Sequence, residues 1–188
     1  MNATYIGKRI WDQCLSGFTI TDCAVRSAST IALCLRKNVE HEQASRMWDH
    51  DIETRLFLAH LDSDGKSDDS FGCRFLTGYN KPRLGVSVTP LRQALLVARN
   101  NDGQVSVMGG GGKFPDEFID PDHVPMPWRI KTIGGYAYSV GGQRKIYKRG
   151  NLGKWVKVAD LPRGERIEAV GFDDLDAFSD NDMYAVGG

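Results

Sequence analysis

The sequence predicts an all-β fold of short antiparallel strands, and three observations support this class. Runs of β-branched, aromatic and other apolar residues recur at strand length along the 188 residues. Glycine is abundant, with 21 residues, and tight turns between strands are the usual reason for such an excess. A segment near the C-terminus recurs after 46 residues. A chain of this length has room for one domain, so we expect a single domain over residues 1–188.

Composition and charge exclude several classes of protein. Apolar residues make up 41% of the chain, which is enough for a hydrophobic core. The 24 basic and 24 acidic residues cancel, which argues against nucleic acid or an anionic membrane as the partner. The longest apolar run, Ile31–Leu35, is too short to span a bilayer, and no apolar stretch of signal-peptide length follows Lys8 and Arg9. We therefore expect a cytoplasmic protein that binds neither nucleic acid nor membrane.

No spacing of cysteines or polar residues predicts a catalytic, metal or cofactor site. The four cysteines fit no zinc motif, and we expect buried, reduced thiols; they are Cys14, Cys23, Cys34 and Cys73. Residues 62–65 are rich in aspartate, but the distal glutamate of a calcium loop is missing, so they predict an acidic turn. The glycine run Gly109–Gly112 and Lys113 precede Phe114 rather than Ser or Thr, which does not predict phosphate binding.

Four strands are predicted in the N-terminal half. Each is a β-rich or apolar run of strand length, and they are Phe18–Val25, Thr30–Leu35, Arg55–Leu61 and Leu84–Val88. The stretch Asn38–Ile52 is the one whose composition favours a helix, although its apolar residues are poorly spaced for one.

Residues 94–108 predict a β-hairpin. Two apolar runs, Ala94–Arg99 and Gln104–Met108, flank the polar segment Asn100–Gly103. Asn, Asp and Gly adopt turn dihedral angles at little cost, and their position between two β-rich runs is a strong hairpin signal. We expect Leu84–Val88 to pair with Gln93–Ala98 or with another neighbouring strand.

Residues 108–128 predict a long loop rich in glycine and proline. Four glycines open it and four prolines follow, so it cannot form a regular helix or strand. Loops of this length in a compact domain are often functional. We expect Phe114 and Phe118 to anchor a partner protein, with Glu117 and Asp120 supplying acidic complementarity. The alternative is that the phenylalanines cover the core and the acids keep the loop soluble.

The C-terminal third contains an internal repeat. The segment Tyr136–Gly142 is echoed by Met183–Gly188, and two alternating runs, Lys145–Arg149 and Lys154–Val158, lie between the copies. A repeat of 40–50 residues built from short strands is typical of a propeller blade. The second copy ends the chain at its glycine pair, so we expect the last blade to be incomplete, or completed by a partner or by further chain. An open blade would expose an unpaired edge.

The residues of this repeat resemble a kelch-type β-propeller repeat. The resemblance covers residues 130–188 and rests on a glycine pair, two aromatics and a Pro-Arg pair: Gly141, Gly142, Tyr147, Trp155, Pro162 and Arg163. It implies glycines that permit close packing at a turn and aromatics that pack between blades. The segment Asn151–Trp155 also resembles a degraded Asp-box turn of sialidase-like propellers.

A rigid scaffold that carries one long loop favours a non-enzymatic, protein-binding function. Small neutral bacterial proteins of this kind resemble immunity proteins that neutralise a toxin, and a subunit of a larger assembly is a further interpretation. The alternative is a propeller-type glycan hydrolase or lyase, which would need a central pocket lined with acids and arginines.

Overall fold

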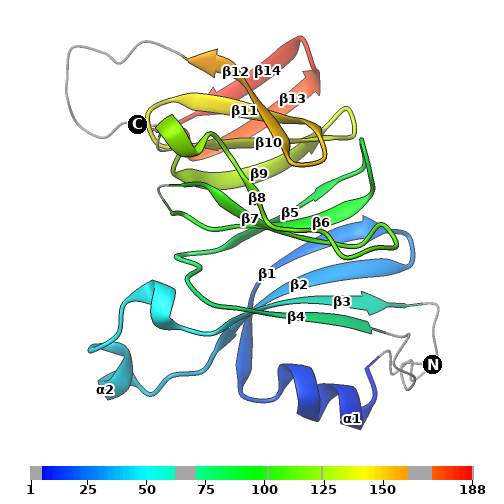
Figure 1. Cartoon of the computed structure of the whole chain (residues 1–188), viewed down its shortest axis with the longest axis vertical. Coiled ribbons are helices and arrows are strands. Elements are labelled where there is room, and N and C mark those ends of the chain that lie inside the picture. The colour runs from blue at the N-terminus through cyan, green and yellow to red at the C-terminus, as the bar shows by residue number, and fades with distance from the viewer. Residues whose placement is uncertain (1–5, 62–70, 101, 124, 161–170, 188) are drawn as a thin grey trace. The chain divides into compact units, whose positions relative to one another are not determined.

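The computed structural model describes residues 6–61, 71–100, 102–123, 125–160 and 171–187. Contacts divide the chain into two compact units, Met1–Lys81 and Pro82–Gly188, and antiparallel sheets form most of each (Figure 1). The prediction of an all-β protein with short antiparallel strands is confirmed. A propeller-like arrangement and a single domain over residues 1–188 stay predictions.

The first unit contains a four-stranded sheet whose strands follow one another in chain order. Its strands are β1 Phe18–Ser27, β2 Thr30–Lys37, β3 Thr54–His60 and β4 Phe71–Leu76. All neighbours pair antiparallel, so the sheet is a meander. The three strands predicted in this region therefore exist as β1, β2 and β3.

Two short helical turns at the start of the chain cover one face of this sheet. They are α1 Lys8–Ile10 and the π-helical turn η1 Trp11–Leu15. Ile10 and Cys14 are buried against Leu35 and Phe57 of the sheet. These turns are too short to be predicted from apolar periodicity, although Ile10 and Cys14 have the spacing of one helical turn.

The helix predicted over Asn38–Ile52 is wrong for most of its length. The structure contains only the four-residue α2 His41–Ala44 and a 3-10 turn, η2 Asp49–Asp51. No residue of either segment is buried. A short helix without an apolar face gains nothing from packing, and packing supplies most of the stability of helices in proteins.

The second unit begins with another four-stranded meander. Its strands are β5 Arg83–Ser87, β6 Gln93–Val97, β7 Gln104–Met108 and β8 Glu117–Phe118. The predicted hairpin is confirmed, because Val97 pairs with Val105 and β6 continues antiparallel along β7. The pairing of β5 with β6 is confirmed as well. The prediction that residues 108–128 form no regular strand or helix is wrong in part, because the segment contains the short strand β8, which pairs with β7, a 3-10 turn, η4 Pro121–His123, and the first two residues of β9 Pro127–Ile133.

A third four-stranded meander and a two-stranded hairpin complete the second unit. The meander comprises β9 Pro127–Ile133, β10 Tyr136–Gly141, β11 Lys145–Asn151 and β12 Lys154–Asp160. The hairpin comprises β13 Asp174–Ser179 and β14 Asp182–Val186. The predicted segments Asp62–Gly65, Pro162 and Arg163 lie outside the described residues.

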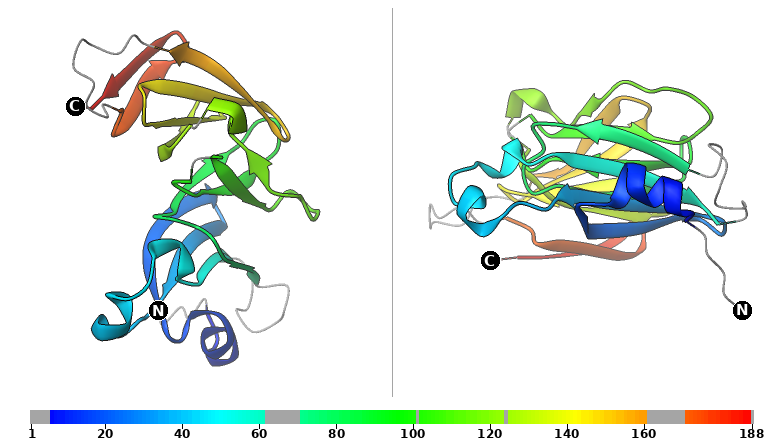
Figure 2. Two further views of the ribbon diagram at one scale, coloured as in Figure 1. Left: turned by 60° about the vertical axis from the view of Figure 1, so that its left-hand side comes forward. Right: turned by 90° about the horizontal axis from the view of Figure 1, so that it is seen from below.

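The sheets of the second unit pack face to face. One face of the β9–β12 sheet contributes Ile130, Ala137 and Tyr147 to a core shared with the β5–β8 sheet. Its other face contributes Tyr138 and Val140 to a core shared with the β13–β14 hairpin. The first strands of successive sheets also touch, β5 with β9 and β9 with β13. The hairpin is therefore the outermost layer of this unit (Figure 2).

The first glycine of each pair in the repeat, Gly141 and Gly187, lies at a point of close backbone approach. A Cβ atom on Gly141 would collide with the carbonyl oxygen of Met126, just before β9. A Cβ atom on Gly187 would collide in the same way with the carbonyl oxygen of Gly171, shortly before β13. Each glycine lies at the end of the second strand of its sheet, β10 or β14. At that point the backbone passes close to the segment that precedes the first strand, β9 or β13, and a side chain larger than that of glycine does not fit.

The cysteines form no disulfide in the described part of the chain. Cys14 and Cys34 are buried, as predicted, and Cys73 is half-buried. Burial and the neighbouring Cys14 thiol raise the pKa of Cys73 to about 12. Cys23 is exposed on β1, so the prediction of burial is wrong for this residue, because β1 turns alternate side chains to solvent.

Candidate functional site

The predicted contact loop, residues 108–128, is held against the second unit by side-chain hydrogen bonds. It leaves β7, returns as β8 beside β7, and then passes through the turn η4 Pro121–His123. The four residues singled out from the sequence lie in four different environments. Phe114 is half-buried, Glu117 is buried, Phe118 is exposed, and Asp120 is half-buried.

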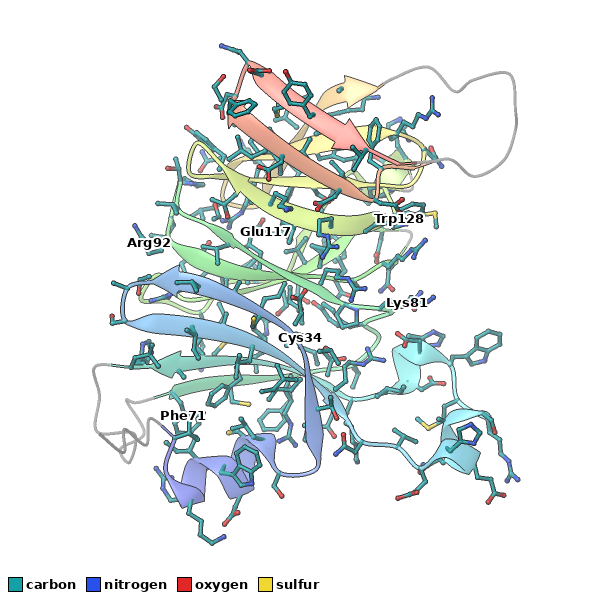
Figure 3. The ribbon with its side chains drawn as sticks, turned by 180° about the vertical axis from the view of Figure 1, so that it is seen from behind. Cys34, Phe71, Lys81, Arg92, Glu117 and Trp128 are labelled. Carbon is teal, nitrogen blue, oxygen red and sulfur yellow. The ribbon has the colours of Figure 1, made fainter. Side chains whose placement is uncertain are left out.

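Glu117 is the centre of a buried hydrogen-bond network, and Figure 3 labels it among the strands of the second unit. Arg149 on β11 donates to both carboxylate oxygens of Glu117, with Nε at 2.9 Å from Oε2 and Nη2 also bonded to Oε1. The indole N–H of Trp155 donates to Oε2 at 2.9 Å, and the backbone N–H of Gly153 donates to Oε1 at 3.0 Å. A fork-like pairing with arginine is the strongest form of carboxylate bond.

The same network fixes the beginning of the contact loop. Arg149 Nη2 donates to the Gln93 side-chain oxygen at 2.7 Å, and the Gln93 amide donates to the Gly109 carbonyl at 3.2 Å. Arg149 is completely buried, so its charge depends on Glu117 for compensation. Sequence reasoning missed Arg149, Gln93 and the role of Trp155, because their positions on three different strands meet only after the sheets stack.

Asp120 fixes the far end of the loop. The Tyr147 hydroxyl donates to Asp120 Oδ2 at 2.9 Å, and His123 Nδ1 lies 2.6 Å from Oδ1. Burial acts to raise the pKa of Asp120, but the hydrogen bonds from His123 and Tyr147 outweigh it and hold this pKa below its usual value. Asp120 is therefore a carboxylate at neutral pH, and both of its oxygens are used within the chain.

The two phenylalanines of the loop differ in exposure, and the exposed side of the loop carries Phe118 together with the charged Lys113 and Asp122. Phe114 packs against the shared core of the two sheets, whereas the Phe118 side chain is 44% exposed. A hollow of about 160 Å³ lies beside the loop, between Phe114 and Pro115 on one side and Leu152 on the other. Phe118 is thus the predicted anchor that the structure leaves accessible. The predicted partner contacts of Phe114, Glu117 and Asp120 stay predictions, and each of these residues also has an internal role.

The described residues contain no group of three or more His, Cys, Asp or Glu side chains that could hold a metal ion. The acid–arginine pair that a glycan-cleaving site would need is present as Glu117 and Arg149, but both side chains are buried and face each other. Within the described part of the chain, no helix is long and apolar enough to cross a membrane.

A comparison with curated proteins finds a relative with a named role. The chain is 31% identical over 106 residues to the immune protein Tsi7 of Pseudomonas aeruginosa. The match covers 52% of this chain and 33% of the relative, so the chain spans about a third of the length of the curated relative that it matches. No protein-family model and no solved structure matches the chain.

Proposed function

We propose that this protein is a non-enzymatic immunity protein, which neutralises a toxin by forming a stoichiometric complex with it. The similarity to an immune protein carries the proposal. The composition agrees with it, because a net charge of zero suits a protein partner better than nucleic acid or membrane. The four-stranded meanders serve in this proposal as blades of a propeller-like scaffold.

The contact loop offers the proposed complex one exposed aromatic side chain, Phe118, on a fixed backbone. Glu117 and Asp120 fix its course through hydrogen bonds to β11, so Phe118 is presented without a large cost in conformational entropy. Exposed aromatic side chains on a fixed backbone are typical of binding anchors. The internal bonds of the two acids therefore support the proposed role of the loop.

The proposal is tested by mixing the purified chain with the toxin encoded by the gene next to its own. We expect a one-to-one complex and complete loss of toxin activity at one molar equivalent, because neutralisation by binding requires one protein for each toxin. Neutralisation by far less than one equivalent would indicate an enzyme instead. Absence of a complex and of protection in cells would overturn the proposal.

The role of the loop is tested with Phe118→Ser. We expect the affinity for the toxin to fall about tenfold or more, because the serine removes the exposed ring but none of the internal bonds. Trp48→Ser is the matched control, since Trp48 is an exposed aromatic of the first unit. An unchanged affinity of the Phe118 variant in surface plasmon resonance would remove the loop from the interface and leave the immunity function intact.

A further inference from the structure

The hairpin β13–β14 presents a bare apolar face. Its inner face packs on the β9–β12 sheet through four small or apolar side chains, Leu175, Ala177, Met183 and Ala185. Side chains alternate along a strand, so the intervening residues point away from that sheet, except Asp174, whose carboxylate pairs with Arg129 and Lys131 of the sheet. Three of them form what we call the hairpin face: Phe178, Tyr184 and Val186, which are 88%, 60% and 61% exposed. The rings of Phe178 and Tyr184 pack edge to face, with centroids 6.2 Å apart.

In the β9–β12 sheet, the positions equivalent to the hairpin face are covered. The glycine pairs align β14 with β10, so Tyr184 corresponds to Tyr138 and Val186 corresponds to Val140. Tyr138 and Val140 are each only 2% exposed, because β13–β14 packs on them. The same two positions are therefore buried in one copy of the repeat and open in the next.

The strand pairing extends this correspondence to Phe178. Tyr138 lies opposite Lys131 in the earlier sheet, and Tyr184 lies opposite Asp176 in the hairpin. Two residues further along each first strand, Ile133 corresponds to Phe178. Ile133 is 6% exposed and belongs to the core beneath the hairpin. All three members of the hairpin face thus have buried equivalents.

The charged residues beside the hairpin face and those beside its equivalent on the β9–β12 sheet have opposite signs. In the earlier sheet Arg129 and Lys131 flank the apolar centre, and both reach the Asp174 carboxylate of the covering hairpin, at 3.8 Å and 3.3 Å. In the hairpin the residues beside the apolar centre are acidic instead. Asp174 and Asp180 are already paired with Arg129, Lys131 and Lys148 of the β9–β12 sheet, whereas Asp176 and Asp182 lie on the same side of the hairpin as Tyr184 and are exposed. A sheet that packs on the hairpin face in the way that the hairpin packs on the β9–β12 sheet therefore needs lysine or arginine around its apolar centre.

We propose that the hairpin face is the docking surface for a β-sheet of the partner protein, with an apolar centre and a rim of lysine or arginine. This inference rests on the proposed function, because the partner is the neutralised toxin. A symmetric dimer through this face is disfavoured, since it would bring Asp176 and Asp182 of two copies together. The contact is face to face, with side chains interdigitating as in packed sheets.

The inference is tested with the toxin encoded by the neighbouring gene and the double variant Phe178→Ser, Tyr184→Ser. We expect the toxin affinity to fall at least about 30-fold, because two central aromatics of the interface are removed. Asp176→Lys should weaken binding about tenfold through repulsion at the basic rim. Trp48→Ser should leave the affinity unchanged. Circular dichroism and thermal unfolding establish that each variant is folded.

Hydrogen exchange of the wild-type chain provides a measurement that needs no variant. We expect the amides of residues 173–187 to gain protection when the toxin binds. Wild-type affinity in the double variant, with no new protection of these amides, would overturn the docking surface and leave the immunity function standing. Failure of the wild-type chain to bind the toxin would overturn both. A dimer of the free chain that the double variant abolishes would assign the face to a second copy and overturn the proposal.

Discussion

Glu117 belongs to the contact loop, yet its carboxylate is buried and hydrogen-bonded within the chain. Its carboxylate accepts bonds from Arg149, Gly153 and Trp155, and the Arg149 side chain has no exposed surface. A buried ion pair contributes little relative to an apolar pair, but removal of one partner leaves an uncompensated charge in the interior. Substitution of either Glu117 or Arg149 alone should therefore disturb the position of the contact loop.

Glu117→Gln should lower the free energy of unfolding by about 3 kcal/mol, because it leaves the buried Arg149 guanidinium without a counter-charge. Urea unfolding followed by tryptophan fluorescence measures the change. Glu42→Gln is the matched control, since Glu42 forms an exposed pair with Arg46, and exposed pairs of this spacing contribute at most about 0.5 kcal/mol. Equal losses in the two variants would contradict the structural role given to Glu117.

At the scale of the sheets, Gly141 and Gly187 allow the backbone of one strand to pass close to the segment that precedes its neighbour. Gly141 and Gly187 are in contact with the chain that leads into the first strand of their own sheet. The Gly141 carbonyl also accepts a hydrogen bond from Phe172 N at 2.8 Å, at the entry to the hairpin. Gly141 thus connects the β9–β10 pair to the hairpin that follows it in the second unit.

Gly141→Ala should lower the free energy of unfolding by about 2 kcal/mol, because the new Cβ would force backbone apart at the entry to β9. Gly150→Ala is the control on the next strand of the same sheet. A Cβ atom at Gly150 would meet only Val156, at 3.7 Å, which is an ordinary contact. Chemical denaturation of both variants measures the difference. A Gly141 variant as stable as the Gly150 variant would show that the close approach is not needed.

At the scale of the whole molecule, charge is unevenly placed although the net charge is zero. Residues 171–187 carry five aspartates without a basic residue. Asp174 and Asp180 are paired with basic residues of the β9–β12 sheet, and Asp173, Asp176 and Asp182 are exposed. A local acidic field of this kind steers a basic partner during encounter, and salt screens it. The proposed interface should therefore show electrostatic steering even though composition alone argues for a neutral protein.

The association rate with the toxin should fall as salt rises from about 0.05 to 0.5 M, because the Debye length shrinks from roughly 14 Å to about 4 Å. Stopped-flow mixing measures the slope. Asp176→Asn together with Asp182→Asn should reduce both the rate at low salt and the slope, whereas Glu42→Gln should change neither. A rate that is independent of salt would contradict the basic rim assigned to the partner.

Much of the local structure is determined by sequence alone. Strand alternation and turn residues are local signals, so β1, β2, β3, β5 and the β6–β7 hairpin are predictable from composition and spacing. The helix over Asn38–Ile52 is not, because a favourable composition does not supply an apolar face. The glycine pairs also reveal the repeat, and with it the register that relates Tyr184 to Tyr138.

Only the tertiary structure decided which of the candidate residues face the solvent. Glu117 and Phe118 are neighbours in a polar, proline-rich segment. The Glu117 carboxylate is nevertheless buried and bonded to Arg149 of β11, whereas the Phe118 ring is exposed. Tyr138 and Tyr184 occupy the same place in the repeat, yet one is covered by the next sheet and the other is not. Alternation assigns a side chain to one face of a strand, whereas burial depends on which distant sheet packs on that face.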